Sequence, residues 1–290
     1  LMSFYKIYDD LINLKNNLFF PLKNNIQNNN DFKRKGFLIE NFAKDHQEYF
    51  EKLSNYIQKN INLNDHRDNL ILKNKDAFNY NIFNNIKESK KNELYSFFST
   101  NELIDKVSLL LGTRCKLQNI GILFNFYNEN TKVNEGSKMW HRDSDTLSDQ
   151  MKVFIPLTKI DINNGKFYFI SNEHVSYDKK FRLDKKKIKN PNISIWNKFR
   201  TDDSQVFEYL KDENKINSIP GNIGQPLYID TSRVYHKGGY INSKNLFRLM
   251  LQATYTPIIT LTSWDTKQNM ISNYLQKKLT SLKIKLQKDI

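Results

Sequence analysis

The spacing of apolar residues changes near residue 117, and this change limits the folds that the chain can adopt. Before it, segments such as Phe42–Ile57 carry apolar residues near helical spacing. After it, short runs of aromatic and β-branched residues alternate with turn signals such as Asn163–Gly165. Several short strands joined by turns are typical of a sandwich, jelly roll or barrel. We therefore expect residues 1–116 to be mostly helical and residues 117–257 to form a β core.

The β core is expected to contain a set of short strands. They span residues 120–127, 152–157, 167–170, 226–229, 234–237 and 246–255. In the helical part, Ser99 followed by Glu102 has the spacing of a capping box and predicts that a helix begins there. Gly112 then suits the left-handed residue that ends this helix. The Asn- and Lys-rich segments 23–35 and 58–92 indicate loops with short helices.

Two further segments interrupt or follow the core. Residues 175–218 form an insertion with a dense lysine cluster, and they are either a lid over a site or a solvated excursion. In the last segment, 258–290, apolar residues recur three and four apart from Lys267 onward, which predicts an amphipathic C-terminal helix. We expect this helix to pack on the domain or to form a homodimer with a second copy, rather than to bind a membrane. The whole of 1–290 is expected to form a single domain.

The composition favours a folded, cytoplasmic protein. Hydrophobic residues make up 39% of the chain, which is enough for a packed core. Cys115 is the only cysteine, so the sequence offers neither an internal disulfide nor a thiolate metal cluster. No apolar run reaches the length of a membrane span, and Leu1–Tyr5 lacks a basic-then-apolar secretory pattern. The net charge of +14 follows from lysine usage along the whole chain, with an anionic partner as the alternative.

The strongest chemical signal is a His and an Asp two positions apart, His141 and Asp143. On a strand, residues i and i+2 point to the same face, so both side chains can reach one ion. His236, on a strand remote in sequence, can supply a third ligand. Two imidazoles and a carboxylate on one face leave three positions open on an octahedral ferrous ion. Taken alone, the His-x-Asp pair is equally compatible with a polar surface pair.

Arg248 lies within an alternating strand. Leu246, Arg248, Met250 and Gln252 are expected on one face of this strand, and Phe247, Leu249, Leu251 and Ala253 on the other. An arginine on a strongly apolar strand is costly unless its guanidinium meets an anion, which it can bind through two parallel hydrogen bonds. That anion is either a bound carboxylate or a carboxylate of the protein, and taken alone Arg248 favours the second.

These residues stand in a characteristic order with their flanking segments. The order runs through Ser137–Asp143, Lys152–Leu157, Asn164–Phe167 and Gly224–Gly239, and it ends at Arg248. In this order and spacing, residues 117–257 resemble the phytanoyl-CoA dioxygenase family of 2-oxoglutarate-dependent oxygenases, with a fainter echo at Lys35–Ile39. The chain departs from the family pattern at Lys166 and at Ser171–His174. Both departures concern loops, so they bear on substrate shape more than on metal binding.

The resemblance implies a mainly β fold with flanking α: a double-stranded β-helix, also called a jelly roll or cupin-like core, with helices packed outside. It implies that His141, Asp143 and His236 bind Fe(II) and that Arg248 anchors a carboxylate of 2-oxoglutarate. Such dioxygenases use O2 to convert 2-oxoglutarate to succinate and CO2 and to hydroxylate a C–H bond of a small molecule. Family members that halogenate have a small residue in place of Asp143, so a carboxylate there favours hydroxylation. Desaturation, epimerisation and ring formation stay as alternatives.

Weaker candidates surround this set. The residues predicted to contact 2-oxoglutarate are Asn125, Tyr127 and Thr158, with ordinary packing between strands as the alternative. The residues predicted to contact substrate are Asp145, Arg233 and Arg142. A regular strand would point Arg142 away from the metal, toward the surface or a lid. Arg233 and the lysines of the insertion could meet an anionic substrate.

Two other functional classes compete with this interpretation. One is a non-catalytic binding module on the same jelly roll, and the complete set of four predicted site residues argues against it. The other is a nucleic-acid-directed oxygenase, although the chain has no evident motif of interleaved basic and aromatic residues for stacking on bases. We therefore expect an Fe(II)- and 2-oxoglutarate-dependent hydroxylase of a small, and in one alternative anionic, molecule.

Overall fold

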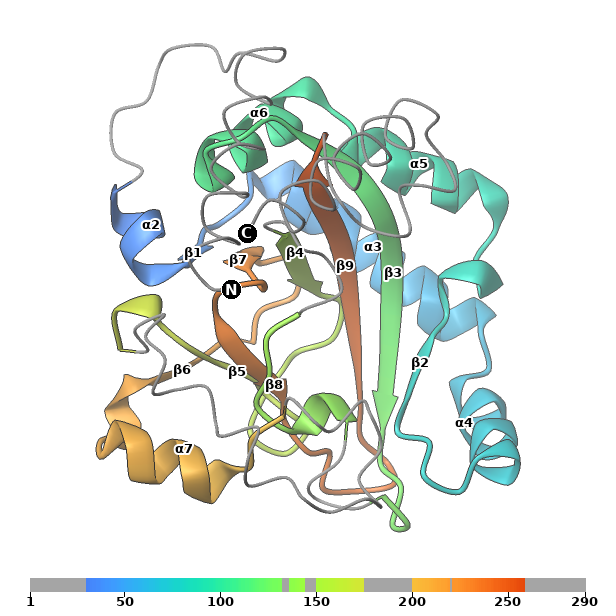
Figure 1. Ribbon diagram of the computed structural model, residues 1–290. Helices are drawn as coiled ribbons and strands as arrows, with labels where there is room; N and C mark the ends of the chain where they lie inside the picture. The colour runs from blue at the N-terminus through green and yellow to red at the C-terminus, as the bar shows by residue number, and fades with distance from the viewer. Residues whose placement is uncertain (1–29, 132–135, 144–149, 175–199, 220, 259–290) are drawn as a thin grey trace, which may run out of the picture.

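The computed structural model describes residues 30–131, 136–143, 150–174, 200–219 and 221–258, and these fold around two antiparallel sheets. The larger sheet has the strand order β1 (Phe37–Ile39), β7 (Leu227–Asp230), β4 (Met151–Pro156), β9 (Phe247–Pro257), β3 (Cys115–Phe126), β2 (Asn79–Asn81). The smaller sheet has the order β6 (Ile216–Ser218), β5 (Phe167–Ile170), β8 (Tyr235–Gly238). The long strands β3 and β9 run side by side through the centre of the molecule (Figure 1).

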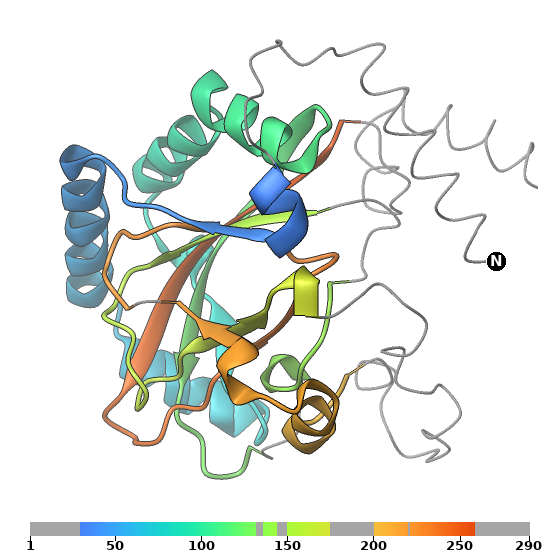
Figure 2. The ribbon, with the colours of Figure 1, turned by 90° about the vertical axis from the view of Figure 1, so that its left-hand side faces the viewer.

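Helices cover the outer faces of both sheets. They are α2 (Asn30–Lys35), α3 (Lys44–Asn60), α4 (Leu63–Lys73), α5 (Glu88–Phe98), α6 (Asn101–Leu111) and α7 (Asp203–Leu210). Figure 2 shows α3 on one side of the larger sheet, with the smaller sheet and α7 on the other. Within the described residues, no helix is both long and apolar enough to cross a membrane.

The alternation of side chains in β9 divides the hydrophobic core into two layers. Leu249 and Leu251 face outward and pack with Phe50 of α3 and Phe98 of α5, all fully buried. Met250 faces inward and joins a second cluster between the two sheets, which includes Phe169 of the smaller sheet. Because successive strand residues point to opposite faces, one apolar strand serves both layers.

A third cluster covers the outer face of the smaller sheet. There Trp140 and Ile170 pack against Val206 and Leu210 of α7. The indole Nε1 of Trp140 donates a hydrogen bond to Asp203 at 2.7 Å. The opposite face of the smaller sheet, here called its inner face, is turned toward the larger sheet. Its side chains meet those of β4 and β9.

The expected β core is confirmed, and each of the expected strands is present within about two residues at most boundaries. Strand β3 begins earlier than expected, at Cys115, and three strands of three residues each were missed: β1, β2 and β6. These are too short to show an alternating pattern. The faint echo at Lys35–Ile39 coincides with β1, which pairs with β7.

The capping-box prediction at Ser99 and Glu102 is wrong. The helix begins at Asn101, its N-cap is Thr100, and no side chain caps it there. Ser99 instead ends the preceding helix α5. Gly112 ends α6 in the left-handed conformation, with φ of 74°, as predicted.

The insertion 175–218 is only partly an excursion from the core. Its described part, residues 200–218, contributes α7, the edge strand β6 and a bridge between Thr201 and Trp140. Residues 175–199, which bear on the lid alternative, lie outside the described residues, as do residues 259–290 with the predicted C-terminal helix.

Candidate metal centre

His141 and His236 lie directly opposite one another on the inner face of the smaller sheet. Their backbones exchange two hydrogen bonds, His141 N–H to His236 O at 3.0 Å and the reverse at 2.9 Å. In an antiparallel pair, opposite residues share a face and their side chains are neighbours. The two imidazole rings accordingly stand with their centroids 4.4 Å apart. Two residues 95 positions apart in sequence are thus placed side by side by strand pairing.

Backbone carbonyls orient both imidazoles. Nδ1 of His141 lies 2.8 Å from the carbonyl oxygen of Met139, and Nδ1 of His236 lies 3.0 Å from that of Val234. A carbonyl can only accept, so each Nδ1 carries the proton and donates it. Each neutral ring therefore presents the lone pair of Nε2, which is the arrangement that metal-binding histidines adopt.

Asp143 brings its carboxylate to the same point. Its Oδ1 lies 3.9 Å from Nε2 of His141, and its Oδ2 lies 3.8 Å from Nε2 of His236. The ligand atoms of the three residues all lie within 4.8 Å of one another, and Oδ2 of Asp143 is buried without a hydrogen bond. One carboxylate and two imidazole nitrogens around a shared point can hold a divalent metal ion.

The electrostatics of the pocket keep all three groups in their metal-binding protonation states. Burial lowers the pKa of His141 well below its usual value, and the neighbouring His236 lowers it further. Burial likewise lowers the pKa of His236. For Asp143, burial acts to raise the pKa, but Lys152 and the two histidines outweigh it, so the pKa is lowered. At neutral pH the site thus holds two neutral imidazoles and one carboxylate.

Lys152 of β4 supplies the cation nearest to Asp143. Its Nζ lies 2.8 Å from Oδ2 of Asp143, the distance of an ion pair. The side chain reaches across from the larger sheet to the smaller one. Sequence reasoning treated Lys152 only as part of a strand, because its contact depends on how the two sheets pack.

Arg248 is a buried cation on the inner face of β9. Its Nε and Nη2 donate to Oδ1 of Asn125, at 3.3 and 3.1 Å, and its Nη1 donates to the carbonyl of Gly165. Both acceptors are uncharged, and no carboxylate of the described residues forms an ion pair with Arg248. Burial lowers the pKa of Arg248 to about 10, which still leaves the guanidinium charged at neutral pH. Among the described residues, Arg248 therefore does not form the salt bridge to a protein carboxylate that the sequence alone favoured.

Gly238 connects Arg248 to the histidines. It stands two residues after His236 on β8 and therefore shares its inner face. A methyl group on Gly238 would lie 3.2 Å from Nη2 of Arg248, so the guanidinium rests against the bare backbone. Two residues of a strand span roughly 7 Å, so the guanidinium beside Gly238 lies about that far along β8 from His236.

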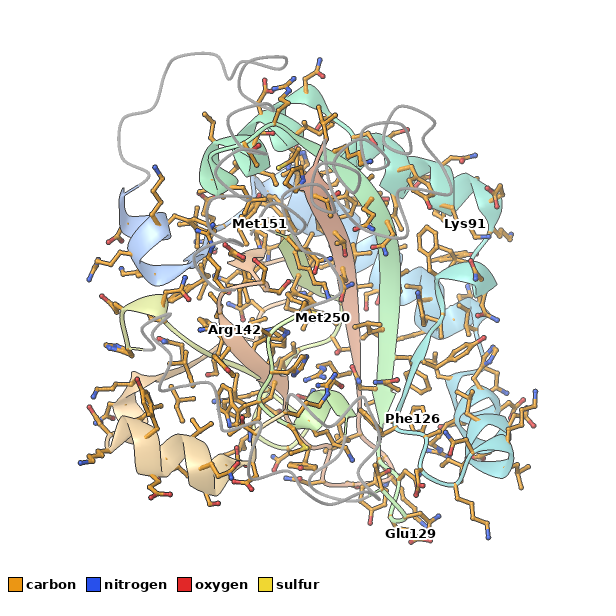
Figure 3. The ribbon with its side chains drawn as sticks, viewed as in Figure 1. Lys91, Phe126, Glu129, Arg142, Met151 and Met250 are labelled. Carbon is orange, nitrogen blue, oxygen red and sulfur yellow. The ribbon has the colours of Figure 1, made fainter. Side chains whose placement is uncertain are left out.

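A cavity of about 310 Å³ opens beside Arg248 and is lined by two of the predicted cofactor contacts, Asn125 and Tyr127. Figure 3 shows two other lining residues, Phe126 and Glu129, at the end of β3 and in the loop that follows it. Thr158, the third predicted contact, does not line this cavity. Its Oγ1 accepts a hydrogen bond from the backbone N–H of Leu249 at 3.1 Å, beside Arg248.

The predicted substrate contacts are not gathered at the metal site. Arg142 points to the outer face of the smaller sheet, where its guanidinium lies 4.3 Å from the centroid of the Tyr235 ring. Arg233 forms an ion pair with Asp230 at 3.4 Å. Asp145 lies outside the described residues.

Arg200 is a further residue that sequence reasoning missed. Thr201 and Trp140 exchange backbone hydrogen bonds, both 2.9 Å long, so Arg200 stands opposite His141 on the inner face. Its Nη1 donates to the carbonyl of Gly136 at 2.7 Å, and its charge contributes to lowering the pKa of both histidines. Nothing in the local sequence signals this pairing between segments 60 residues apart.

Comparisons with known proteins support the fold. No protein-family model matches the sequence, and no curated protein is similar to it in sequence. Among solved structures, the non-haem α-ketoglutarate-dependent carbocyclase SnoK from nogalamycin biosynthesis is similar with a TM-score of 0.51 and 12% identity, over 82% of this chain and 87% of that one. The apo form of EctD from S. alaskensis gives 0.48 and 14%, over 81% and 79%. The likeness to SnoK confirms the jelly-roll fold.

Proposed function

We propose that this chain is an Fe(II)- and 2-oxoglutarate-dependent dioxygenase of the phytanoyl-CoA dioxygenase type. The observation that carries the proposal is the pairing of a three-ligand metal site with Arg248, a buried guanidinium that has only uncharged acceptors among the described residues. A buried cation of this kind is costly unless an anion reaches it. A dicarboxylate that binds the metal at one end and Arg248 at the other satisfies both requirements.

The donor set fits Fe(II). His141, Asp143 and His236 provide two imidazoles and one carboxylate, and three protein ligands leave three positions of a six-coordinate ion for other ligands. Zn²⁺ also accepts nitrogen and oxygen ligands, but it favours four-coordinate sites. The 2-oxoacid end of 2-oxoglutarate provides two further oxygen ligands, which suits a six-coordinate ion. SnoK, which shares the fold, is a non-haem α-ketoglutarate-dependent enzyme, and its dependence is consistent with this choice.

The far carboxylate of 2-oxoglutarate fits the surroundings of Arg248. The guanidinium can bind a carboxylate through two parallel hydrogen bonds. Asn125 accepts from Arg248 through Oδ1, so its amide N–H groups are the part that can donate to the same carboxylate. Gly238 keeps the space beside the guanidinium open. In this arrangement the path of about 7 Å along β8 matches a five-carbon diacid between the two ends.

When bound, Fe(II) and 2-oxoglutarate supply the oxidising chemistry, in which O2 converts 2-oxoglutarate to succinate and CO2 and a C–H bond is hydroxylated. The protein holds the metal through His141, Asp143 and His236 and directs the co-substrate through Arg248. The carbonyls of Met139 and Val234 keep each Nε2 deprotonated for the metal. The apolar layer between the sheets, which includes Phe167 beside the His236 ring, limits the access of water. We infer hydroxylation of a small molecule because Asp143 occupies the third ligand position.

Product analysis tests this proposal. Purified protein with Fe(II), 2-oxoglutarate and O2 should form succinate, and His141→Ala should reduce the rate at least about a hundredfold, as expected for loss of a metal ligand. His66→Ala, at a histidine of α4 that stacks on Tyr80, is the matched control and should keep the full rate. Metal content is measured in parallel. Protein that binds iron but forms no succinate, with or without added small molecules, would favour the non-catalytic binding module instead.

A further inference from the structure

Lys152 is a second inward-facing cation that the proposed function does not use. It lies on β4 opposite Thr254 of β9 and Ile229 of β7, so its side chain points between the sheets. Its Nζ reaches Asp143 on the other sheet at 2.8 Å. The side chain is 15% exposed, against 11% for Asp143, so solvent reaches this side of the metal site to a small extent.

The charges of the loaded site leave Lys152 without a full counter-ion, if the proposed function is correct. The dianion 2-oxoglutarate matches the charge of Fe(II), and the charge of Asp143 matches that of Arg248. Within the described residues, Asp143 is the one carboxylate at ion-pair distance from Lys152, and the metal shares it. Lys152 therefore adds one positive charge to a largely buried site, and an uncompensated charge there is costly.

Arg200 adds positive charge to the same space from the other sheet. It lies opposite His141 on the inner face, two residues away from Asp143 along the neighbouring segment. Lys152 and Arg200 thus approach the metal site from opposite sheets. The electrostatic influence of Arg200 on both histidines is consistent with this placement. Lys152 and Arg200 both act electrostatically on His236, so both charges lie near the metal site. Two cations near one site are an arrangement that binds a carboxylate, sulfonate or phosphate.

We propose that Lys152 and Arg200 form an anion-binding subsite beside the metal centre, and that the primary substrate is a small molecule bearing a negatively charged group. The anionic group binds to these two cations, and Arg248 is left to 2-oxoglutarate. Its binding offsets part of the positive charge that Lys152 and Arg200 bring to the loaded site. The group also fixes the C–H bond that reacts, because it tethers the substrate a short distance from the metal. This proposal rests on the proposed function.

Simple anions can test the subsite before the substrate is known. The protein is loaded with Fe(II) and saturating 2-oxoglutarate without oxygen, and its visible charge-transfer band is followed at constant ionic strength. Acetate is titrated as the probe, and acetamide, its uncharged counterpart, is titrated in parallel. We expect acetate to shift the band saturably and acetamide to leave it unchanged.

Variants separate the two cations from general effects of charge. Lys152→Met should weaken acetate binding at least about tenfold, the loss expected for one charge-assisted hydrogen bond, and Lys152→Arg should retain it. Arg200→Met should also weaken acetate binding, and it leaves the ion pair between Lys152 and Asp143 in place. Lys91→Met, at a partly buried position of α5 where Lys91 pairs with Glu88, is the control and should bind acetate like the unmodified protein.

The outcomes distinguish this inference from the proposed function. If the unmodified protein shows no charge-transfer band, the proposed function fails. If the band is present but acetate does not shift it, or shifts it equally in Lys152→Met and Arg200→Met, the anion subsite is wrong and the proposed function stands. If Lys152→Met loses the band itself, acetate binding is compared in Lys152→Arg and Arg200→Met instead. Binding that is retained in Lys152→Arg and weakened in Arg200→Met supports the subsite, and equal binding in both contradicts it.

Discussion

The guanidinium of Arg248 rests against the bare Cα of Gly238, where a methyl group would come within 3.2 Å of Nη2. This contact joins the strand that carries His236 to the strand that carries the buried cation. Nitrogen and carbon at 3.2 Å are closer than ordinary van der Waals contact, so either the methyl group or the guanidinium would have to move. The position of Arg248 is thus sensitive to a single carbon atom on β8.

Gly238→Ala is therefore expected to weaken 2-oxoglutarate binding about tenfold, a change of about 1.4 kcal/mol. The guanidinium would shift by a few tenths of an ångström and meet the carboxylate less squarely. Metal binding should be unchanged, because Gly238 does not touch the ligands. Calorimetric titration of the metal-loaded protein measures both. Equal affinity for 2-oxoglutarate in the variant and the unmodified protein would show that Arg248 does not bind it.

Asn125→Asp is expected to block the co-substrate by supplying the counter-ion that Arg248 lacks. The new carboxylate would sit where Oδ1 already accepts from Nε and Nη2. We expect 2-oxoglutarate to bind more than tenfold more weakly while the free energy of unfolding is maintained, because a buried pair replaces a lone buried charge. Asn85→Asp, at an exposed position, is the control. Unchanged affinity in Asn125→Asp would argue against a carboxylate at Arg248.

The metal site should respond to pH in a defined direction. Burial lowers the pKa of His141 and His236 below the usual 6.5, so both imidazoles stay neutral when unfolded histidines take up protons. Metal affinity should therefore hold roughly constant from about pH 8 to pH 6.5 and fall only at lower pH. The free energy of unfolding of metal-free protein should decline as the pH drops below about 6.5. Metal titrations and denaturant unfolding at stepped pH measure these effects; a metal affinity that already falls with a midpoint near 6.5 would contradict them.

Helix caps offer a test of the fold apart from the site. The side chain of Asn62 accepts a hydrogen bond from the backbone N–H of Asp65 and caps α4, so Asn62→Ala should cost about 1 kcal/mol. Ser99→Ala should cost almost nothing, because Ser99 does not cap α6. Urea unfolding of the two variants makes the comparison. A larger loss for Ser99→Ala than for Asn62→Ala would mean that the capping box forms after all.

Strand alternation explains why much of the fold and of the candidate site could be predicted from the sequence. The pattern of 246–255 placed Arg248 and Met250 on one face and Leu249 and Leu251 on the other, as the two core layers confirm. The same rule put Arg142 on the face opposite to His141, where it contacts Tyr235. These features depend only on the alternation of side chains along one strand, so they can be predicted from the local sequence.

Features that depend on pairing between distant segments could not be predicted in this way. Lys152 meets Asp143 because two sheets pack face to face, and Arg200 stands opposite His141 because of a single bridge at Thr201. Neither contact leaves a trace in the local pattern. The failed capping box has a different cause: Ser99 and Glu102 have the required spacing, but α6 starts one residue later than this spacing requires.

The central claim is that Arg248 and the three metal ligands together hold 2-oxoglutarate. Its most direct test is an anaerobic titration of Fe(II)-loaded protein with 2-oxoglutarate, followed by the visible charge-transfer band of the chelated metal. We predict a saturable band with one equivalent bound in the unmodified protein and in Arg34→Met, an exposed control on α2. In Arg248→Met the affinity should fall at least about a hundredfold, because a buried charge pair is lost. No band in the unmodified protein, or equal affinity in Arg248→Met, would contradict the claim.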